Sequence, residues 1–410
     1  MARWPLVALA LGYGLLFLRY ATIERVLAFD PVAAMNAQFA DVPVEQRGWP
    51  AMREALIAMH ADDPAALEML RQASRCEVLG FYAGHPEDLS PEDAELWPEL
   101  VPDQNQTEKI KPWSWEQSAF TILLPHLSDF REAALYLKDH AVEQGEGGSL
   151  EDLRAMRRLS VLCHEQPTLI NQLVGMSILS LEVHTLSNLL MDQGMNYSDE
   201  TLAAFEAELD LALAALSPLS LQGEKITFDD VLQRMYSDDG AGNGIFIGGS
   251  DALSEGMEFM GFPDRRRTTV DTVVAPLLAQ WMPDRQTTRE LYAAMMAEQV
   301  DFCKAPLWDR SEESQFEGTG NPIIDLMLPA LTKAIDQVQL KRMEVEAMSL
   351  VVAAYRERIR TGAFPAEAPI EVRDCWVDGL IGYEVVDGLP QVRSAGPNQK
   401  GQILFPVRSE

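Results

Sequence analysis

The chain has 410 residues, of which 47% are hydrophobic, and its 63 acidic and 33 basic residues give a formal net charge of −30. This length and apolar content support two or three domains with real hydrophobic cores, and they exclude an intrinsically disordered acidic chain. Because such a negative surface repels the phosphate backbone, we expect no nucleic-acid partner.

The N-terminal segment is apolar, with no charge from Trp4 to Leu18. A membrane span needs about 20 residues, and residues 4–23 reach that length if the side chain of Arg19 extends to the interface. No small-x-small cleavage site follows, which favours an uncleaved anchor over a cleaved signal peptide. We therefore predict a membrane anchor in residues 1–27, with the acidic body outside the cytoplasm in the cell envelope or periplasm.

Helical patterns dominate the middle of the chain. We predict that residues 28–112 are helical and loop-rich, because a stretch rich in Pro and acidic residues follows one short helix. Residues 113–305 are predicted to form an α-helical domain. Within that domain, residues 168–194 are apolar on most sides, which predicts a central, buried helix, and Ser198 is predicted to cap the helix that follows.

The C-terminal part combines a long helix with a small sheet. Residues 306–321 are predicted to be a linker, and residues 322–410 a long helix followed by a small antiparallel sheet. Apolar residues recur every three or four positions from Ile324 to Ile359, which predicts a packing seam within the chain; an oligomeric coiled coil is the alternative. Asp387-Gly388 predicts a hairpin turn. The predicted fold class is mainly α: an anchor, a multi-helix domain and an α+β tail.

The four cysteines are Cys76, Cys163, Cys303 and Cys375. Their wide spacing and the lack of a CxxC motif do not indicate a zinc cluster. Disulfides and buried unpaired cysteines remain alternatives for an exported body.

The glycine-rich stretch YSDDGAGNGIFIGGS, residues 236–250, is the first candidate site. It lacks the lysine of a P-loop, the strand–helix context of a dinucleotide site and the acidic spacing of an EF-hand. Asp238, Asp239 and Asn243 are weak candidates for a calcium site. The main prediction is a structural loop whose glycines allow left-handed turns.

Motifs of the common catalytic classes are absent from the sequence. Six histidines are present without an HExxH motif, and there is no GxSxG motif. In the stretch CHEQP, Cys163 and His164 are neighbours, so on a helix their side chains diverge by about 100° and do not form a nucleophile–base pair. Paired carboxylates carry little information in so acidic a chain. No catalytic or cofactor-binding residue is predicted.

The C-terminal region carries a recognisable pattern. A long helix ends in a Tyr and a Gly before an aromatic–Pro pair, a strand segment then carries an Asp, an aromatic residue and a later Tyr, and an S-x-GPN turn follows. The residues of this pattern are Tyr355, Gly362, Phe364, Pro365, Asp374, Trp376, Tyr383, Ser394, Gly396, Pro397 and Asn398. Over about 60 residues it resembles the C-terminal half of the major pseudopilins of type II secretion.

This resemblance implies a helix-to-sheet plan in which Trp376 and Tyr383 are aromatic anchors. The N-terminus lacks a prepilin cleavage motif, so the chain is not expected to be a pilin subunit. The segment after Asn398 lacks acidic residues, which weakens any transfer of a pseudopilin calcium site. The preceding helical region is similar to membrane-anchored bacterial envelope proteins with the same tail, which implies an architecture and a location, not a reaction.

Three functions follow as hypotheses. The leading one is a membrane-anchored extracytoplasmic protein that is a structural or protein-binding component of the bacterial envelope, with envelope proteins as partners. The first alternative is an enzyme, a hydrolase whose site is assembled from residues far apart in the sequence. The second alternative is a structural protein stabilised by calcium.

Overall fold

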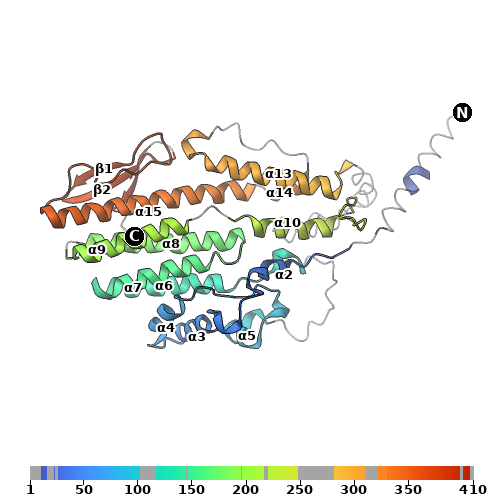
Figure 1. The fold of residues 1–410 in the computed structure, drawn as a ribbon, viewed down its shortest axis with the longest axis horizontal. Coiled ribbons are helices and arrows are strands. Elements are labelled where there is room, and N and C mark those ends of the chain that lie inside the picture. The colour runs from blue at the N-terminus through green and yellow to red at the C-terminus, as the bar shows by residue number, and fades with distance from the viewer. Residues whose placement is uncertain are drawn as a thin grey trace.

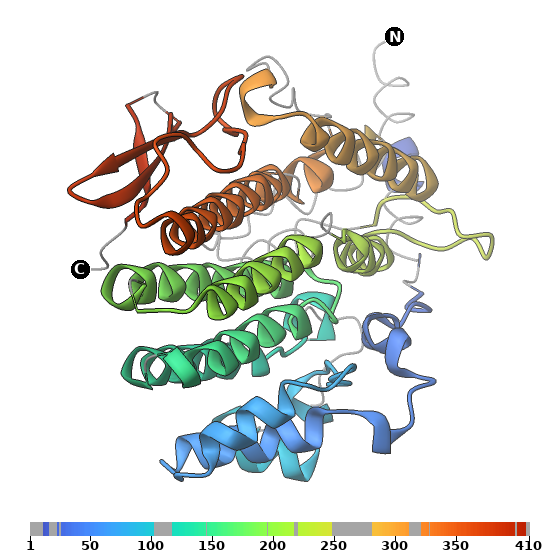
Figure 2. The same ribbon diagram turned by 60° about the vertical axis from the view of Figure 1, so that its left-hand side comes forward.

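The fold is built of stacked helical layers with a small sheet on the outside (Figures 1 and 2). The computed structural model describes residues 11–15, 23, 26–101, 117–144, 146–194, 196–216, 220–247, 281–310, 321–327, 329–397 and 400–406.

The helices of the layers follow one another in chain order. The short helix α2 (Pro31–Asn36) leads into the first layer, which contains α3 (Trp49–His60), α4 (Ala66–Ala73) and α5 (Pro91–Leu96). The next two layers contain α6 (His126–Gln144), α7 (Glu146–Leu162), α8 (Leu169–Gln193) and α9 (Asp199–Ala215). The remaining helices are α10 (Gln222–Met235), α13 (Arg285–Lys304), α14 (Pro322–Met327) and α15 (Pro329–Thr361).

Side-chain caps fix where several of these helices begin. Ser198 accepts a hydrogen bond from the amide of Thr201 at 3.1 Å, which confirms the cap predicted for α9. Asp284 caps α13 in the same way, through the amide of Thr287 at 2.8 Å. These caps satisfy amides that have no acceptor within the helix.

The central helix, α8, is a core element. Leu169–Asp192 is the one helix among the described residues that is long and apolar enough to cross a membrane, and 61% of its most apolar window is buried inside the protein. Leu179, Leu186 and Leu190 on α8 each keep 3% or less of their surface exposed. The prediction of a buried central helix is confirmed.

The long helix α15 packs on α8 and α9. Val345 and Val352 of the predicted seam are fully buried in this contact, whereas Ile359 near the end of the helix is 42% exposed. Gly362 follows with φ of +86°, a conformation that L side chains rarely adopt, and ends the helix there. The predicted seam therefore serves packing within the chain.

The tail sheet has strands β1 (Gly382–Val386), β2 (Leu389–Ser394) and β3 (Gln402–Phe405), in the order β1-β2-β3 and antiparallel throughout. Val386 pairs with Leu389, and the residues between them, Asp387 and Gly388, have φ of 51° and 80°. Two positive φ values define the hairpin turn that the sequence predicted. With this sheet, the predicted mainly α fold that ends in a long helix and a small antiparallel sheet is confirmed.

Two hydrophobic clusters hold the layers together. The larger one extends from Trp49 to Phe405 and includes α15 and the sheet as well as the helices of the middle layers. The smaller one lies between α8, α10, α13, α14 and α15, around residues such as Phe228, Tyr236 and Tyr292. Buried residues from α15 and the sheet belong to the same cluster as those from the helices of the middle layers.

The cysteines are small core or near-core residues where they are described. Cys163 is fully buried, and Cys76 and Cys375 are half-buried; all three are free. The side chain of Cys303 lies outside the described set. The described thiols therefore fit the buried, unpaired alternative.

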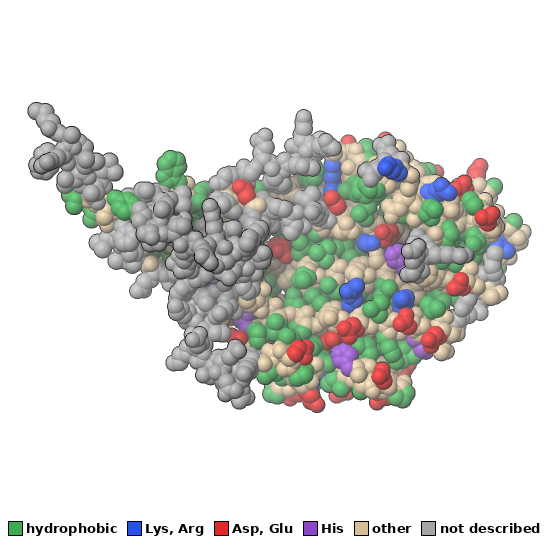
Figure 3. Space-filling model, turned by 180° about the vertical axis from the view of Figure 1, so that it is seen from behind, with side chains coloured by type: hydrophobic (Ala, Val, Ile, Leu, Met, Phe, Trp, Pro, Cys, Tyr) green, Lys and Arg blue, Asp and Glu red, His purple; other side chains and the backbone are tan. Residues whose placement is uncertain are grey.

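Charge is spread over the surface. On the face shown in Figure 3, apolar and charged side chains alternate, and acidic side chains gather along the lower edge, which is the side of the α3–α5 layer. Apart from this edge, the charges on the face shown are distributed, as on a solvated surface.

Candidate functional site

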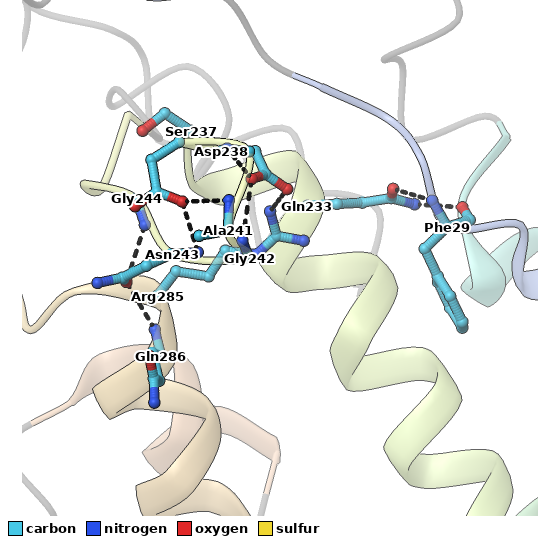
Figure 4. Close-up of polar contacts among 12 residues, drawn as sticks. Phe29, Gln233, Ser237, Asp238, Ala241, Gly242, Asn243, Gly244, Arg285 and Gln286 are labelled. Carbon is cyan, nitrogen blue, oxygen red and sulfur yellow. Dashed lines mark hydrogen bonds and ion pairs between the residues drawn. The ribbon is translucent and has the colours of Figure 1, made fainter.

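Residues 236–247 of the glycine-rich stretch form a closed loop between α10 and α13 (Figure 4), and residues 248–250 lie outside the described residues. Asp238 Oδ1 accepts hydrogen bonds from the amides of Gly240 at 2.8 Å and Gly242 at 3.3 Å. Its Oδ2 forms an ion pair with Arg285 Nη1 at 2.8 Å. The hydrogen bond from Gly240 is the main reason why the pKa of Asp238 lies below its usual range. Gly240 and Gly242 have φ of +84° and +87°, as a structural loop requires.

The other two calcium candidates also bind backbone amides. Asp239 Oδ1 accepts from Ala241 at 2.8 Å and from Asn243 at 3.1 Å. Asn243 Oδ1 accepts from Gly244 at 2.8 Å and from Gln286 in the first turn of α13 at 3.0 Å. At least one oxygen of each candidate therefore holds the loop or the start of α13. The predicted structural loop accounts for these residues, and calcium binding stays an untested alternative.

The stretch CHEQP is a junction between α7 and α8, not a catalytic pair. His164 Nδ1 lies 2.9 Å from the carbonyl oxygen of Ser160 in the preceding turn. Glu165 accepts from the amides of Leu79 and Gly80, and Gln166 donates to the carbonyl oxygen of Phe81 at 2.8 Å. Burial raises the pKa of the Cys163 thiol far above its usual range, so the thiolate does not form near neutral pH.

The partner of this junction is an extended segment, residues 79–84, which lies across the entrance to α3. Trp49 N donates to the carbonyl oxygen of Leu79 at 2.8 Å. Leu123 N donates to that of Gly84 at 2.7 Å. Polar groups from three distant parts of the chain thus hold this extended segment in place, and a shift of the segment by one residue would break all of these bonds.

A pocket of 350 Å³ opens on the other side of this segment. We call it the aromatic pocket, because Trp49, Phe81 and Tyr82 form much of its wall, together with the side chains of His85 and Asp93. Trp49 and Phe81 are 6% and 3% exposed, whereas Tyr82 at the rim is 45% exposed. An apolar pocket with a few polar groups is the usual form of a small binding site.

The polar groups of the aromatic pocket are fixed by their neighbours. Asp93 accepts hydrogen bonds from Trp49 Nε1 at 2.7 Å, from Arg53 at 3.2 Å and from the hydroxyl of Ser90 at 2.7 Å. This carboxylate therefore orients the indole ring, and the three hydrogen bonds use most of its acceptor capacity.

His85 is held by a neighbouring hydroxyl. Its Nδ1 lies 3.1 Å from the hydroxyl of Thr121, whose oxygen is also 2.9 Å from the carbonyl oxygen of Ser118. The Thr121 hydroxyl therefore fixes the orientation of the imidazole ring at the pocket. No hydrogen bond joins His85 to Ser90 within the described part of the chain, so this pocket suits binding better than nucleophilic catalysis.

Carboxyl groups with a raised pKa are scattered. Burial raises the pKa of Glu182 on α8 to about 8, and burial also raises the pKa of Glu165 at the junction and of Glu224 on α10. An acid–base enzyme needs such groups to face one reacting centre. Because these three lie in separate contacts, they do not support the hydrolase alternative.

An arginine-lined hollow of 410 Å³ lies between α4, α7 and α9. Arg75 pairs with Glu151 at 3.0 Å, and Arg154 pairs with Glu151 at 2.6 Å and with Glu208 at 2.7 Å. Arg157, which is 6% exposed, pairs with Glu208 beneath them. These alternating charges join three helices, which is the common structural use of such a cluster.

The residues that carry the pseudopilin-like pattern meet as one structural unit. Asp374 Oδ1 accepts from Trp376 N at 2.8 Å and from the hydroxyl of Ser394 at 2.9 Å, while its Oδ2 accepts from Ala395 N at 2.6 Å. The hydroxyl of Tyr383 donates to the carbonyl oxygen of Pro365 at 3.2 Å. Trp376 and Tyr383 are half-buried against the larger core, and Asn398 lies outside the described residues.

Comparison with protein-family models, with curated proteins and with solved structures finds no match to this chain. The resemblance to pseudopilins therefore stays a prediction, and function has to be argued from the molecule itself.

Proposed function

We propose that this chain is a membrane-anchored protein of the bacterial envelope whose helical body binds a partner protein outside the cytoplasm. The proposal of a membrane anchor rests on one observation. Residues 11–15 are helical and stand apart from the body (Figure 1), and Leu11 and Leu15 are 64% and 68% exposed. Leucines of the body's core are almost fully buried, so these two need an apolar environment that the body does not supply.

The chain that leaves the anchor is bound to the body at once. Phe29 N donates to Gln233 Oε1 at 3.0 Å, and Gln233 Nε2 donates to the carbonyl oxygen of Phe29 at 2.8 Å (Figure 4). Gln233 is itself held by Asp230, which accepts from its Nε2 at 2.8 Å. Asp30 then caps α2 through the amide of Ala33 at 2.9 Å. This ordered attachment suits a body that works close to the membrane.

In this proposal, the partner protein binds at the aromatic pocket. Its rim residue Tyr82 is stacked under the guanidinium of Arg47, 4.5 Å from the ring centre, so it is both exposed and rigid. Rigid aromatic and arginine side chains around an apolar pocket are typical anchors of protein interfaces. A partner side chain of modest size fits a volume of 350 Å³.

Membrane attachment is tested by fractionating cells that express the full chain or residues 28–410 alone. The full chain should stay in membranes after alkaline carbonate extraction, and the truncated chain should be soluble. A C-terminal alkaline phosphatase fusion should be active, because the body lies outside the cytoplasm. Release of the full chain by carbonate, or an inactive fusion, contradicts the anchored and exported arrangement.

Partner binding is tested with a photo-cross-linking amino acid at position 82, in the full chain in intact cells. The matched control carries the same amino acid at position 136, because Tyr136 on α6 is 36% exposed and does not line the pocket. A discrete cross-linked protein at position 82 but not at 136 supports the site. Identical patterns at both positions, or no cross-link at position 82, would overturn it.

A further inference from the structure

A histidine and two carboxylates converge at the contact between α3 and α6. His60 is the last residue of α3, and Asp129 and Glu132 lie one turn apart on α6, on the same face of that helix. His60 Nε2 is 3.6 Å from Asp129 Oδ1 and 3.5 Å from Glu132 Oε2. All three ligand atoms lie within 4.8 Å of one another.

These separations match the geometry of a small metal ion. Zinc binds imidazole nitrogen and carboxylate oxygen at about 2.0–2.2 Å with tetrahedral geometry, which places two ligand atoms about 3.3–3.5 Å apart. The two measured separations of 3.5 and 3.6 Å are therefore within a few tenths of an ångström of the edges of such a tetrahedron. Small side-chain rotations of the exposed His60 and Glu132 would complete the fit.

The surroundings of Asp129 also suit a cation. Its side chain is 9% exposed, and its Oδ2 accepts a hydrogen bond from Trp97 Nε1 at 2.7 Å. Its Oδ1 accepts no hydrogen bond from the described residues and faces His60. A nearly buried carboxylate oxygen without a donor is costly unless a positive charge lies beside it. The indole hydrogen bond also fixes the carboxylate, as outer-shell groups do around metal ligands.

The charge around this point is negative. The carboxylates of Glu132 and Glu99 both act electrostatically on Asp129, and His60 is the one nitrogen ligand that faces them. Two carboxylates beside one imidazole, with the third carboxylate of Glu99 acting on Asp129, leave an excess of negative charge that a divalent ion would neutralise. Mixed imidazole and carboxylate ligands favour Zn²⁺ and similar transition metals over Ca²⁺ and Mg²⁺, which bind mainly to oxygen.

We propose that His60, Asp129 and Glu132 form a binding site for a divalent transition-metal ion of the Zn²⁺ class. Three protein ligands leave a fourth position for water or for a donor atom from another molecule. The site is separate from the aromatic pocket and does not depend on membrane attachment. The competing explanation is an ion pair in which protonated His60 bridges two carboxylates without any metal.

The test uses the full chain, purified in detergent and treated with a chelator, and measures thermal unfolding and isothermal titration with ZnCl₂. We expect Zn²⁺ to raise the melting temperature and to bind with a stoichiometry of about one, while Ca²⁺ and Mg²⁺ have no such effect. The variants His60→Ala and Glu132→Gln should each weaken zinc binding at least about 10-fold. Both positions are exposed, with side-chain exposures of 38% and 58%, so the variants are expected to fold.

The matched control is His140→Ala, which removes a different His–Asp pair, between His140 and Asp152 at 2.8 Å. This variant should keep the full zinc effect. Co²⁺ provides a second readout, because a three-ligand site should give the visible absorption of low-coordinate cobalt, and His60→Ala should abolish it. No zinc binding by the parent protein, or zinc binding that both site variants retain, overturns the proposal.

Discussion

The side-chain amide of Asn36 pairs with the backbone of Ala83 on both of its edges. Asn36 Nδ2 donates to the carbonyl oxygen of Ala83 at 2.6 Å, and Ala83 N donates to Asn36 Oδ1 at 2.9 Å. The side chain thereby acts as a short strand that pairs with the segment of residues 79–84. It joins the end of α2 to the segment that forms part of the wall of the aromatic pocket.

Replacing Asn36 by Ala should therefore destabilise the protein by about 2–4 kcal/mol, because it leaves a buried N–H and a buried C=O without partners. Chemical denaturation of the full chain in detergent measures the loss. The control is Gln72→Ala, which removes an exposed hydrogen bond to Glu68 on the same helix and should cost under about 0.5 kcal/mol. Equal stability of the two variants would show that the Asn36–Ala83 pair contributes nothing.

His126 should limit stability at acidic pH. Its ring is surrounded by Phe81, Trp49 and Phe130, with ring centres 4.2, 6.3 and 5.5 Å away. Neither ring nitrogen has a hydrogen-bond partner, and burial lowers the pKa of His126 from 6.5 to about 3. The unfolded chain takes up a proton below pH 6.5 while the folded chain does not. Stability from this residue is therefore present above pH 6.5 and is lost as the pH falls towards 3.

The variant His126→Phe removes both the unpartnered nitrogens and this titration. We expect it to be about 1–2 kcal/mol more stable at pH 7. Its advantage over the parent protein should grow by at most about 1.4 kcal/mol for each pH unit between 6.5 and 3. Denaturation curves for both proteins at several pH values give the difference. An advantage that is constant with pH would contradict the assigned pKa.

Glu182 should have the opposite pH dependence. It is fully buried, burial raises its pKa from 4.5 to about 8, and the charge of Arg157 opposes this shift. The folded protein holds a proton that the unfolded chain has released above pH 4.5, so stability from this residue is complete below pH 4.5 and is lost as the pH rises to 8. Glu182→Gln should become progressively more stable than the parent protein over that window. Parallel stability curves from pH 4.5 to 8 would rule this out.

Asp374 should be the main polar support of the tail sheet. It accepts hydrogen bonds from Trp376 N, from the hydroxyl of Ser394 and from Ala395 N. Asp374→Ala leaves three donors without this acceptor and should destabilise the tail by about 3–5 kcal/mol. Limited proteolysis should then cut the variant within residues 362–406 first. The nearby Asp378→Ala is the control, because the Asp378 side chain is 71% exposed.

The glycine loop should be insensitive to calcium. Asp238, Asp239 and Asn243 already accept hydrogen bonds that close the loop, and Arg285 already neutralises Asp238. We expect 1 mM Ca²⁺, a concentration typical of weak extracellular sites, to leave the melting temperature unchanged. A rise with Ca²⁺ that Asp238→Asn abolishes would instead establish the calcium hypothesis.

Features that depend on neighbouring residues could be predicted from the sequence. Asp387-Gly388 specifies a turn with two positive φ values wherever it occurs between strands, and Ser198 caps α9 through an amide three residues later. The apolar surface of α8 likewise follows from its own composition. In each case the interaction that decides the structure lies within a few residues.

The candidate sites depend on contacts between residues far apart in the sequence, so no local sequence pattern predicts them. Trp49 and Phe81 meet because the segment of residues 79–84 crosses the entrance of α3. His60 meets Asp129 because α3 packs on α6. The pair Asp129 and Glu132, three residues apart, is visible in the sequence. An acidic chain has many such pairs, however, and the sequence does not show which of them lies next to a histidine. The sharing of one core by α8, α9 and α15 is equally a matter of packing.

The two hydrogen bonds between Phe29 and Gln233 limit how far the body can lie from the proposed membrane span. If residues 4–23 lie in the bilayer, as we propose, residues 24–28 separate the end of the span from Phe29, and the six residue-to-residue steps of a fully extended chain cover at most about 22 Å. If the proposed anchor holds, the C-terminal end of α10, where Gln233 lies, can rise no further than this above the lipid surface. The protein would then be confined to a thin shell next to the membrane. Any partner that meets it on the α2 and α10 side must itself come within this shell.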